Sequence, residues 1–134
     1  MKKLLLTLML AIVSGSVMAE WVLYGFSNGS KKGIIITVYA DPATLIKSGN
    51  TVKMWSIFDY NKAQKDPNSP SFMSVKRQEE YDCKEEKKRL LYADFHSENM
   101  GKGDIVFNED ATSKWTRLVP KSISQSLGEV ACGK

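Results

Sequence analysis

Two cysteines, Cys83 and Cys132, are the residues whose chemistry the sequence constrains most. They are the only cysteines in the 134-residue chain and lie 49 positions apart. A thioredoxin-type redox pair needs the pattern Cys-x-x-Cys, which is missing, and a zinc site needs several Cys or His ligands, whereas the chain has one His. An even number of cysteines in an oxidising compartment indicates a disulfide. We therefore predict that Cys83 and Cys132 form a structural disulfide in an exported protein.

The amino terminus supplies the evidence for export. A positive start, 1–3, precedes an apolar stretch, 4–13, and small residues end at Ala19. This three-part pattern is typical of a secretory signal peptide, and the apolar stretch is too short to cross a bilayer comfortably as a helix. We predict cleavage after Ala19 and no later membrane span. Because Glu20 rather than a cysteine follows, we expect a periplasmic, secreted or cell-surface protein that is not lipid-anchored.

The remaining chemistry-bearing residues have plainer interpretations than catalysis. His96, the only histidine, shares a strand face with Asp94, but no nucleophile is identified beside it, so we expect a strand histidine near the surface. The glycines of Met100–Asp104 lack the spacing of a phosphate-binding loop and suit a turn. Five carboxylates could supply an acid–base pair, yet they are interleaved with Lys and Arg, as on a solvated face. They are Glu79, Glu80, Asp82, Glu85 and Glu86. The sequence therefore predicts no enzyme, no metal site and no cofactor.

The charge balance argues against a nucleic-acid partner. The chain carries 19 Lys+Arg against 15 Asp+Glu, a formal net charge of +4. Removal of Lys2 and Lys3 with the signal peptide leaves 17 against 15, or +2. A nucleic-acid binder is expected to present a one-sided basic surface, whereas here lysines and acidic residues alternate.

Alternation of apolar and polar residues with period two dominates after Glu20 and predicts β-strands. Six strands are expected at 20–27, 34–40, 51–60, 71–83, 88–97 and 104–109, with a short extended piece at 114–119. Between the second and third strands, Asp41, Pro42 and Gly49 predict a helix of one or two turns. We expect one domain, 20–134, because two domains would each fall below the usual size.

The tail, after Pro120, carries the one well-marked helix. Ser122 and Gln125 fit a capping box, and Gly133 ends the helix. Ile123, Leu127, Val130 and Ala131 fall on one stripe, while Gly128 weakens the helix by up to about 1 kcal/mol relative to Ala. The expected fold class is α+β: a mainly antiparallel six-stranded β-sheet with a C-terminal α-helix packed on it and tied by the disulfide.

The predicted helix is too narrow to cover the predicted sheet. Six strands about 4.8 Å apart span roughly 24 Å, while a helix is about 10 Å across. A sheet curled towards a barrel or a second copy of the chain would cover the rest, and we favour a homodimer. Of the aromatic side chains, we assign Trp55 to the core and leave Trp21 and Trp115 open between core and a binding platform.

Several segments resemble the bacterial surface-adhesin protein E family. These are 80–91, 95–103 and 115–134, and the stretches 20–25 and 52–60 are also similar. The motifs are Tyr81-Asp82-Cys83, Met100-Gly101-Lys102-Gly103, Pro120-x-Ser122 and Ala131-Cys132. The resemblance implies an antiparallel sheet with a disulfide-tied C-terminal helix, binding of host matrix and serum proteins, and dimers. It implies no catalytic residue. Many members are lipid-anchored, whereas this sequence lacks the anchoring cysteine.

Two functions follow as hypotheses. The first is an exported, non-enzymatic module that binds an extracellular-matrix or other surface protein through the charged hairpin at 84–89. Its contact residues would be Lys84, Lys87, Lys88 and Arg89, which would make association salt-sensitive. The alternative is a periplasmic small-ligand-binding protein, or an enzyme of unknown chemistry, with a pocket lined by Trp55 and its neighbours.

Overall fold

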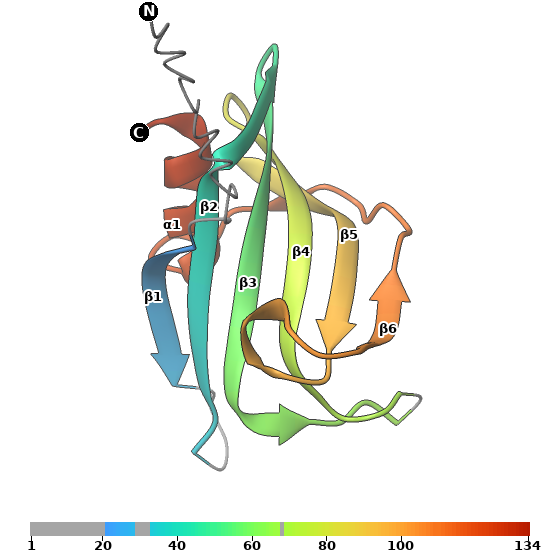
Figure 1. Cartoon of the computed structure of the whole chain (residues 1–134). Coiled ribbons are helices and arrows are strands. Elements are labelled where there is room, and N and C mark those ends of the chain that lie inside the picture. Colours follow the sequence, from blue (N-terminus) through green and yellow to red (C-terminus); the bar gives the residue numbers. More distant parts are fainter. Residues whose placement is uncertain (1–20, 29–32, 68) are drawn as a thin grey trace, which may run out of the picture.

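A computed structural model describes residues 21–28, 33–67 and 69–134 of the chain (Figure 1). The predicted signal peptide and its cleavage site lie outside these residues, as does the predicted turn after Asn28. In the part that is described, no helix combines the length and apolar character needed to cross a membrane.

One antiparallel sheet forms the body of the protein, with strands side by side in chain order from β1 to β6 (Figure 1). A two-residue strand, β7, pairs with the start of β5, so that β6 and β7 share that strand as neighbour. The strands are β1 Val22–Asn28, β2 Ile35–Ser48, β3 Thr51–Gln64, β4 Phe72–Asp82, β5 Lys87–His96, β6 Ile105–Glu109 and β7 Thr116–Arg117. A 3-10 turn, η1 Asn99–Gly101, precedes β6, and helix α1 Ile123–Cys132 ends the chain. The predicted fold class is confirmed.

Helix α1 packs on one face of the sheet, which we call the inner face, over β1, β2, β3 and β4. Alternate residues of the strands point towards it, as the period of two requires. The buried cluster beneath the helix consists of Val38, Ala40, Val52, Met54, Tyr81, Leu127 and Ala131. Ile123 and Val130 pack against this cluster from the helix, so the predicted apolar stripe is confirmed.

Aromatic side chains, and not the helix, fill the far end of the sheet. Phe72, Val75 and Ala93 are buried there. Tyr60, Phe72, Phe95 and Phe107 meet edge to face in sequence, with centroids 5.8, 4.9 and 5.3 Å apart. Such pairs add to the stability that area burial gives. The long strands β2 and β3 bend visibly across the molecule (Figure 1).

The short helix predicted after Asp41 is wrong, because β2 continues to Ser48. Asp41 does act as a local acceptor: its Oδ1 accepts the Ala43 N–H at 3.0 Å, and its carbonyl accepts the Thr44 hydroxyl at 2.6 Å. These bonds form a turn that bulges the strand, after which pairing resumes at Ile46 and Lys53. Thr44 Oγ1 also accepts the Trp55 N–H at 3.1 Å, which ties the bulge to β3. Asp41 thus accepts local hydrogen bonds as predicted, but sheet pairing overrides the helix.

The capping box of α1 is present. Ser122 Oγ accepts the Gln125 N–H at 3.2 Å. Gln125 reaches back to the Lys121 N–H at 2.7 Å, one residue before the position that a standard box uses. Gly133 ends the helix in the left-handed conformation at φ 70°, as its sequence position predicts.

Gly128 lies close to the side chains of Leu118 and Tyr81. A Cβ at this position would lie 2.7 Å from Leu118 Cδ1 and 3.5 Å from Tyr81 Cδ1. We expect Gly128→Ala to be neutral within about 1 kcal/mol, because the gain in helix propensity offsets the displaced Leu118 methyl. Gly128→Leu should destabilise by about 1–3 kcal/mol through overpacking.

Urea unfolding measures both Gly128 variants. Ser126→Leu, at an exposed position of the same helix, is the matched control and should cost little. Equal losses for Gly128→Leu and Ser126→Leu would contradict close packing at Gly128.

Candidate functional site

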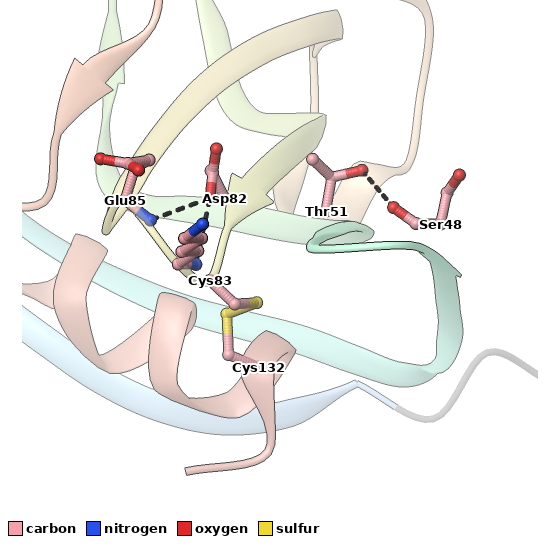
Figure 2. Close-up of a disulfide and its surroundings, with 7 residues drawn as sticks. Ser48, Thr51, Asp82, Cys83, Glu85 and Cys132 are labelled. Atoms are coloured by element: carbon pink, nitrogen blue, oxygen red, sulfur yellow. Dashed lines mark hydrogen bonds between the residues drawn. A yellow bond between two sulfur atoms is a disulfide. The ribbon is translucent and has the colours of Figure 1, made fainter.

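The predicted disulfide between Cys83 and Cys132 is confirmed (Figure 2). The sulfur atoms are 2.07 Å apart and the Cα atoms 5.7 Å apart. Cys83 begins the turn that follows β4, and Cys132 is the last residue of α1. The Cys83 N–H donates to Asn50 O at 2.9 Å, which also holds the turn against the β2–β3 connection. The bond therefore ties the end of the helix to the tip of a hairpin.

The charged turn between β4 and β5 is fixed by Asp82. Its Oδ1 accepts the N–H groups of Lys84 at 3.0 Å and Glu85 at 2.9 Å, as Figure 2 shows. This pattern is typical of aspartate in turns. The side chains of Lys84 and Glu85 are exposed, so the turn presents charge of both signs to water.

The four cations predicted to bind a partner do not share one face. Lys87 and Arg89 lie on the face opposite α1, which we call the outer face, because they pair with Asp82 and Glu80 of β4. Lys88 points to the inner face, where its Nζ lies 2.8 Å from Glu79 Oε2. Lys84 is exposed at the turn. Their role in binding stays a prediction, and Lys88 differs from the others because it points to the inner face.

Glu79 and Glu80 are buried, so the interpretation of the carboxylates as a solvated face is wrong for these two. Glu79 is 1% exposed and Glu80 is 6% exposed. Each is neutralised by a cation from β5: Lys88 for Glu79, and Arg89 for Glu80, with Arg89 Nη2 at 2.6 Å from Glu80 Oε1. Burial, and then the neighbouring Glu79 carboxylate, hold the pKa of Tyr81 well above its ordinary value. Buried charges of this kind persist only when paired.

Cations and aromatic rings form a strip on the outer face, which we define as Trp55, Lys76, Lys87, Arg89, Tyr92 and Trp115. Lys76 Nζ lies 5.2 Å from the Trp55 ring centroid and 5.9 Å from that of Trp21. The Arg89 guanidinium lies 4.4 Å from the Trp115 ring centroid. All three distances suit cation–π attraction.

Trp55 therefore lies outside the core, contrary to prediction. It is half-buried on the outer face, where its ring meets Tyr92 edge to face at 6.0 Å. Tyr92 in turn donates to Asp94 Oδ1 at 2.6 Å, and this hydrogen bond raises the pKa of Tyr92. A pocket of about 490 Å³ lies beside α1 and is not lined by Trp55.

His96, expected near the surface, is 7% exposed. The turn that contains η1 folds over the outer face beside it. Ser74 Oγ donates to Glu98 O at 2.6 Å and accepts the Gly101 N–H at 2.9 Å, while Asp59 Oδ1 accepts the Met100 N–H at 2.9 Å. Neither nitrogen of His96 has a hydrogen-bond partner among the described residues. The glycines of Met100–Asp104 thus serve a structural turn.

The sequence does not reveal the outer strip because its members come from four separate segments, β3, β4, β5 and the segment after β6. Period-two alternation does place Lys76 and Glu80 of β4 on one face, and Lys87 and Arg89 of β5 on one face. However, the register shifts between the Gln78–Tyr92 and Glu79–Leu90 pairs. This irregularity brings Tyr92 to the same face as Arg89, three residues away, which alternation alone would not predict.

No curated protein sequence matched the chain. Among solved structures, crystal form II of Haemophilus influenzae protein E is 15% identical, with a TM-score of 0.58, and the match covers 84% of this chain and 96% of that one. Protein E from non-typeable Haemophilus influenzae is 14% identical, with a TM-score of 0.52, and the match covers 85% and 84%. These likenesses show a shared fold. The model of the family described as surface-adhesin protein E matches residues 21–133. Since this match spans the described domain almost from end to end, the chain belongs to the surface-adhesin protein E family.

Proposed function

We propose that the protein is an exported, non-enzymatic module that binds an extracellular-matrix or other surface protein through the 84–89 hairpin and the adjoining outer strip. The observation that carries this proposal is the pairing of Arg89 with Trp115 and of Lys76 with Trp55. Arginine, tryptophan and tyrosine are enriched among residues that dominate binding energy at protein interfaces. Family membership supports the same role and suggests no enzymatic activity.

The partner's contact surface is expected to be acidic. Lys84 and Lys87 have no carboxylate partner in the described part of the chain, so both are available to a ligand. Arg89 keeps Glu80 as a partner and offers mainly the surface around Trp115. Surface cations without a carboxylate partner raise association rates and make binding salt-dependent.

The test is binding to immobilised matrix glycoproteins, measured by a surface sensor. Lys84→Ala/Lys87→Ala should weaken binding roughly three- to tenfold, since each exposed charge contact contributes modestly. Lys65→Ala/Lys102→Ala removes the same charge from exposed positions elsewhere and should leave binding unchanged. Lys88→Ala and Arg89→Ala are left out of this set because each unpairs a buried carboxylate. Equal loss in the test and control pairs would reduce the effect to net charge and contradict a hairpin site.

Export and a homodimer belong to the same proposal. We propose cleavage after Ala19, and the amino-terminal sequence of the protein recovered from cells tests it. Protease treatment of intact cells then separates surface display, which leaves the protein exposed, from a soluble periplasmic location.

An edge strand, β1, with exposed Val22 and Leu23 supports pairing with a second copy. Light scattering after size-exclusion chromatography measures the oligomeric state.

A further inference from the structure

A groove of about 490 Å³ lies between the turn after β4, the segment at 117–120 and helix α1. Its volume falls within the roughly 300–1,000 Å³ that is typical of ligand pockets. The Cys83–Cys132 disulfide and Gly128 line one part of it, and Leu118, Val119 and Pro120 line another. The groove is separate from the outer strip, whose residues do not line it.

The walls of the groove are tied to the sheet and to the helix. The Leu118 N–H donates to Glu86 O at 2.9 Å, and β7, immediately before Leu118, pairs with Lys87 and Lys88 of β5. Across the groove, the disulfide fixes the last turn of α1. A site held in place by the fold loses little conformational entropy when a ligand binds, which favours affinity.

The groove offers an apolar surface to a ligand. Val119 is 63% exposed, which is the largest exposed fraction among the exposed large hydrophobic residues of the described chain. It adjoins Leu118 and Pro120, and together with the disulfide sulfur atoms these side chains provide contacts without hydrogen-bonding demands. An apolar side chain from a partner would remove this surface from water.

The rim of the groove is acidic, although the whole chain is basic. Asp82, Glu85, Glu86 and Glu129 line it, against the cations Arg117 and Lys134. The net charge of the whole sequence is +4. In the described part of the chain, Glu85, Glu86 and Glu129 form no ion pair. Unpaired carboxylates beside an apolar floor are complementary to cations beside an apolar side chain.

We propose that this groove binds a segment of a partner protein in which apolar side chains are flanked by lysine or arginine. The inference rests on the proposed protein-binding function and adds a second, oppositely charged contact to it. The hairpin then has two roles: its lysines face an acidic surface, and the carboxylates of Glu85 and Glu86 face a basic segment.

The probe is a fluorescein-labelled peptide, Gly-Lys-Leu-Leu-Lys-Gly, measured by fluorescence anisotropy with the full mature protein. It should bind more tightly than Gly-Lys-Ser-Ser-Lys-Gly and Gly-Glu-Leu-Leu-Glu-Gly, and raising the salt from about 0.05 to about 0.5 M should weaken it. Glu85→Lys/Glu129→Lys should weaken binding at least roughly tenfold, because two attractive contacts become repulsive. Val119→Ser should weaken it without changing the salt dependence. Glu109→Lys/Asp110→Lys, at exposed positions on and beside β6, is the matched control and should bind as the unsubstituted protein does.

Three outcomes would overturn the proposal. One is that the leucine peptide binds no better than the serine peptide. Another is unchanged binding by Glu85→Lys/Glu129→Lys. The third is that this double variant converts a dimer to a monomer in light scattering, which would make the groove a contact between copies. Lys84→Ala/Lys87→Ala should leave peptide binding intact, so failure of the hairpin to bind matrix proteins and failure of the groove to bind peptide are seen separately.

Discussion

Replacing Cys83 and Cys132 together with serine should lower the free energy of unfolding by about 4 kcal/mol or somewhat less. The bond closes a loop with a sequence separation of 49. Loop-closure entropy for a span of this length gives about 4 kcal/mol in the chain-entropy model, before any effect of the substitution on packing. A domain of this size has a net stability of about 5–15 kcal/mol, so the bond is a large fraction of the total. Urea unfolding of the oxidised protein and the double serine variant measures the difference.

The loss should concentrate in α1. The helix has 10 residues, below the roughly 12–15 at which isolated helices become marginally stable in water. Leu127 and Ala131 are buried against the sheet, and the disulfide holds them there. Amide hydrogen exchange should therefore rise first in α1 of the serine variant, while β2, β3 and β4 stay protected. The single variants Cys83→Ser and Cys132→Ser, measured with reductant, serve as controls for the lost sulfur contacts. Uniform exchange across the sheet and helix would contradict a local role for the bond.

The parts of the fold that follow from local patterns could be predicted from the sequence. Alternation located all six main strands, and Ser122, Gln125 and Gly133 located both ends of α1, because caps and strand periodicity depend on neighbouring residues only. The disulfide followed from export and from the count of two cysteines. The turn at Asp41 shows the limit of local signals: the same Asp-Pro pattern that begins a helix also begins a bulge, and pairing with β3 decides between them.

The candidate sites depend on contacts between residues that lie far apart in the sequence. Trp115 comes from the segment after β6, yet it lies over Arg89 of β5. The groove combines a hairpin turn, β7 and the C-terminal helix, which are brought together by the disulfide, by the pairing of β7 with β5 and by a backbone hydrogen bond from Leu118. Glu79 was assigned to water because the charge run around it looked solvated, whereas the strand register turns it inward opposite Met54. Charge composition cannot separate two faces of one strand.

Removing the partner of the buried Glu79 carboxylate should cost about 3 kcal/mol. Lys88 Nζ lies 2.8 Å from Glu79 Oε2, and the Glu79 side chain is 1% exposed. Breaking a buried pair from one side typically costs about 3–5 kcal/mol, because the remaining charge is left without compensation. We expect the lower end of this range for Lys88→Met, because Arg77 Nε lies 3.7 Å from Glu79 Oε1 and can neutralise part of the Glu79 charge. Urea unfolding measures the change.

The adjacent pair supplies a matched control, because Arg89 and Glu80 sit one position along the same two strands. The Arg89 side chain is 33% exposed, so water can partly solvate the Glu80 carboxylate that Arg89→Met leaves unpaired. The free energy of unfolding should therefore fall by about 1 kcal/mol. The double variant Glu79→Leu/Lys88→Met should recover most of the stability lost in Lys88→Met, since apolar side chains can replace a buried pair at little net cost. If the double variant is no more stable than Lys88→Met, the lost packing of the lysine stem, rather than an unpaired carboxylate, accounts for the effect. A low cost for Lys88→Met would mean that Arg77 alone neutralises Glu79, and the inner face would then depend on β4 for its charge balance.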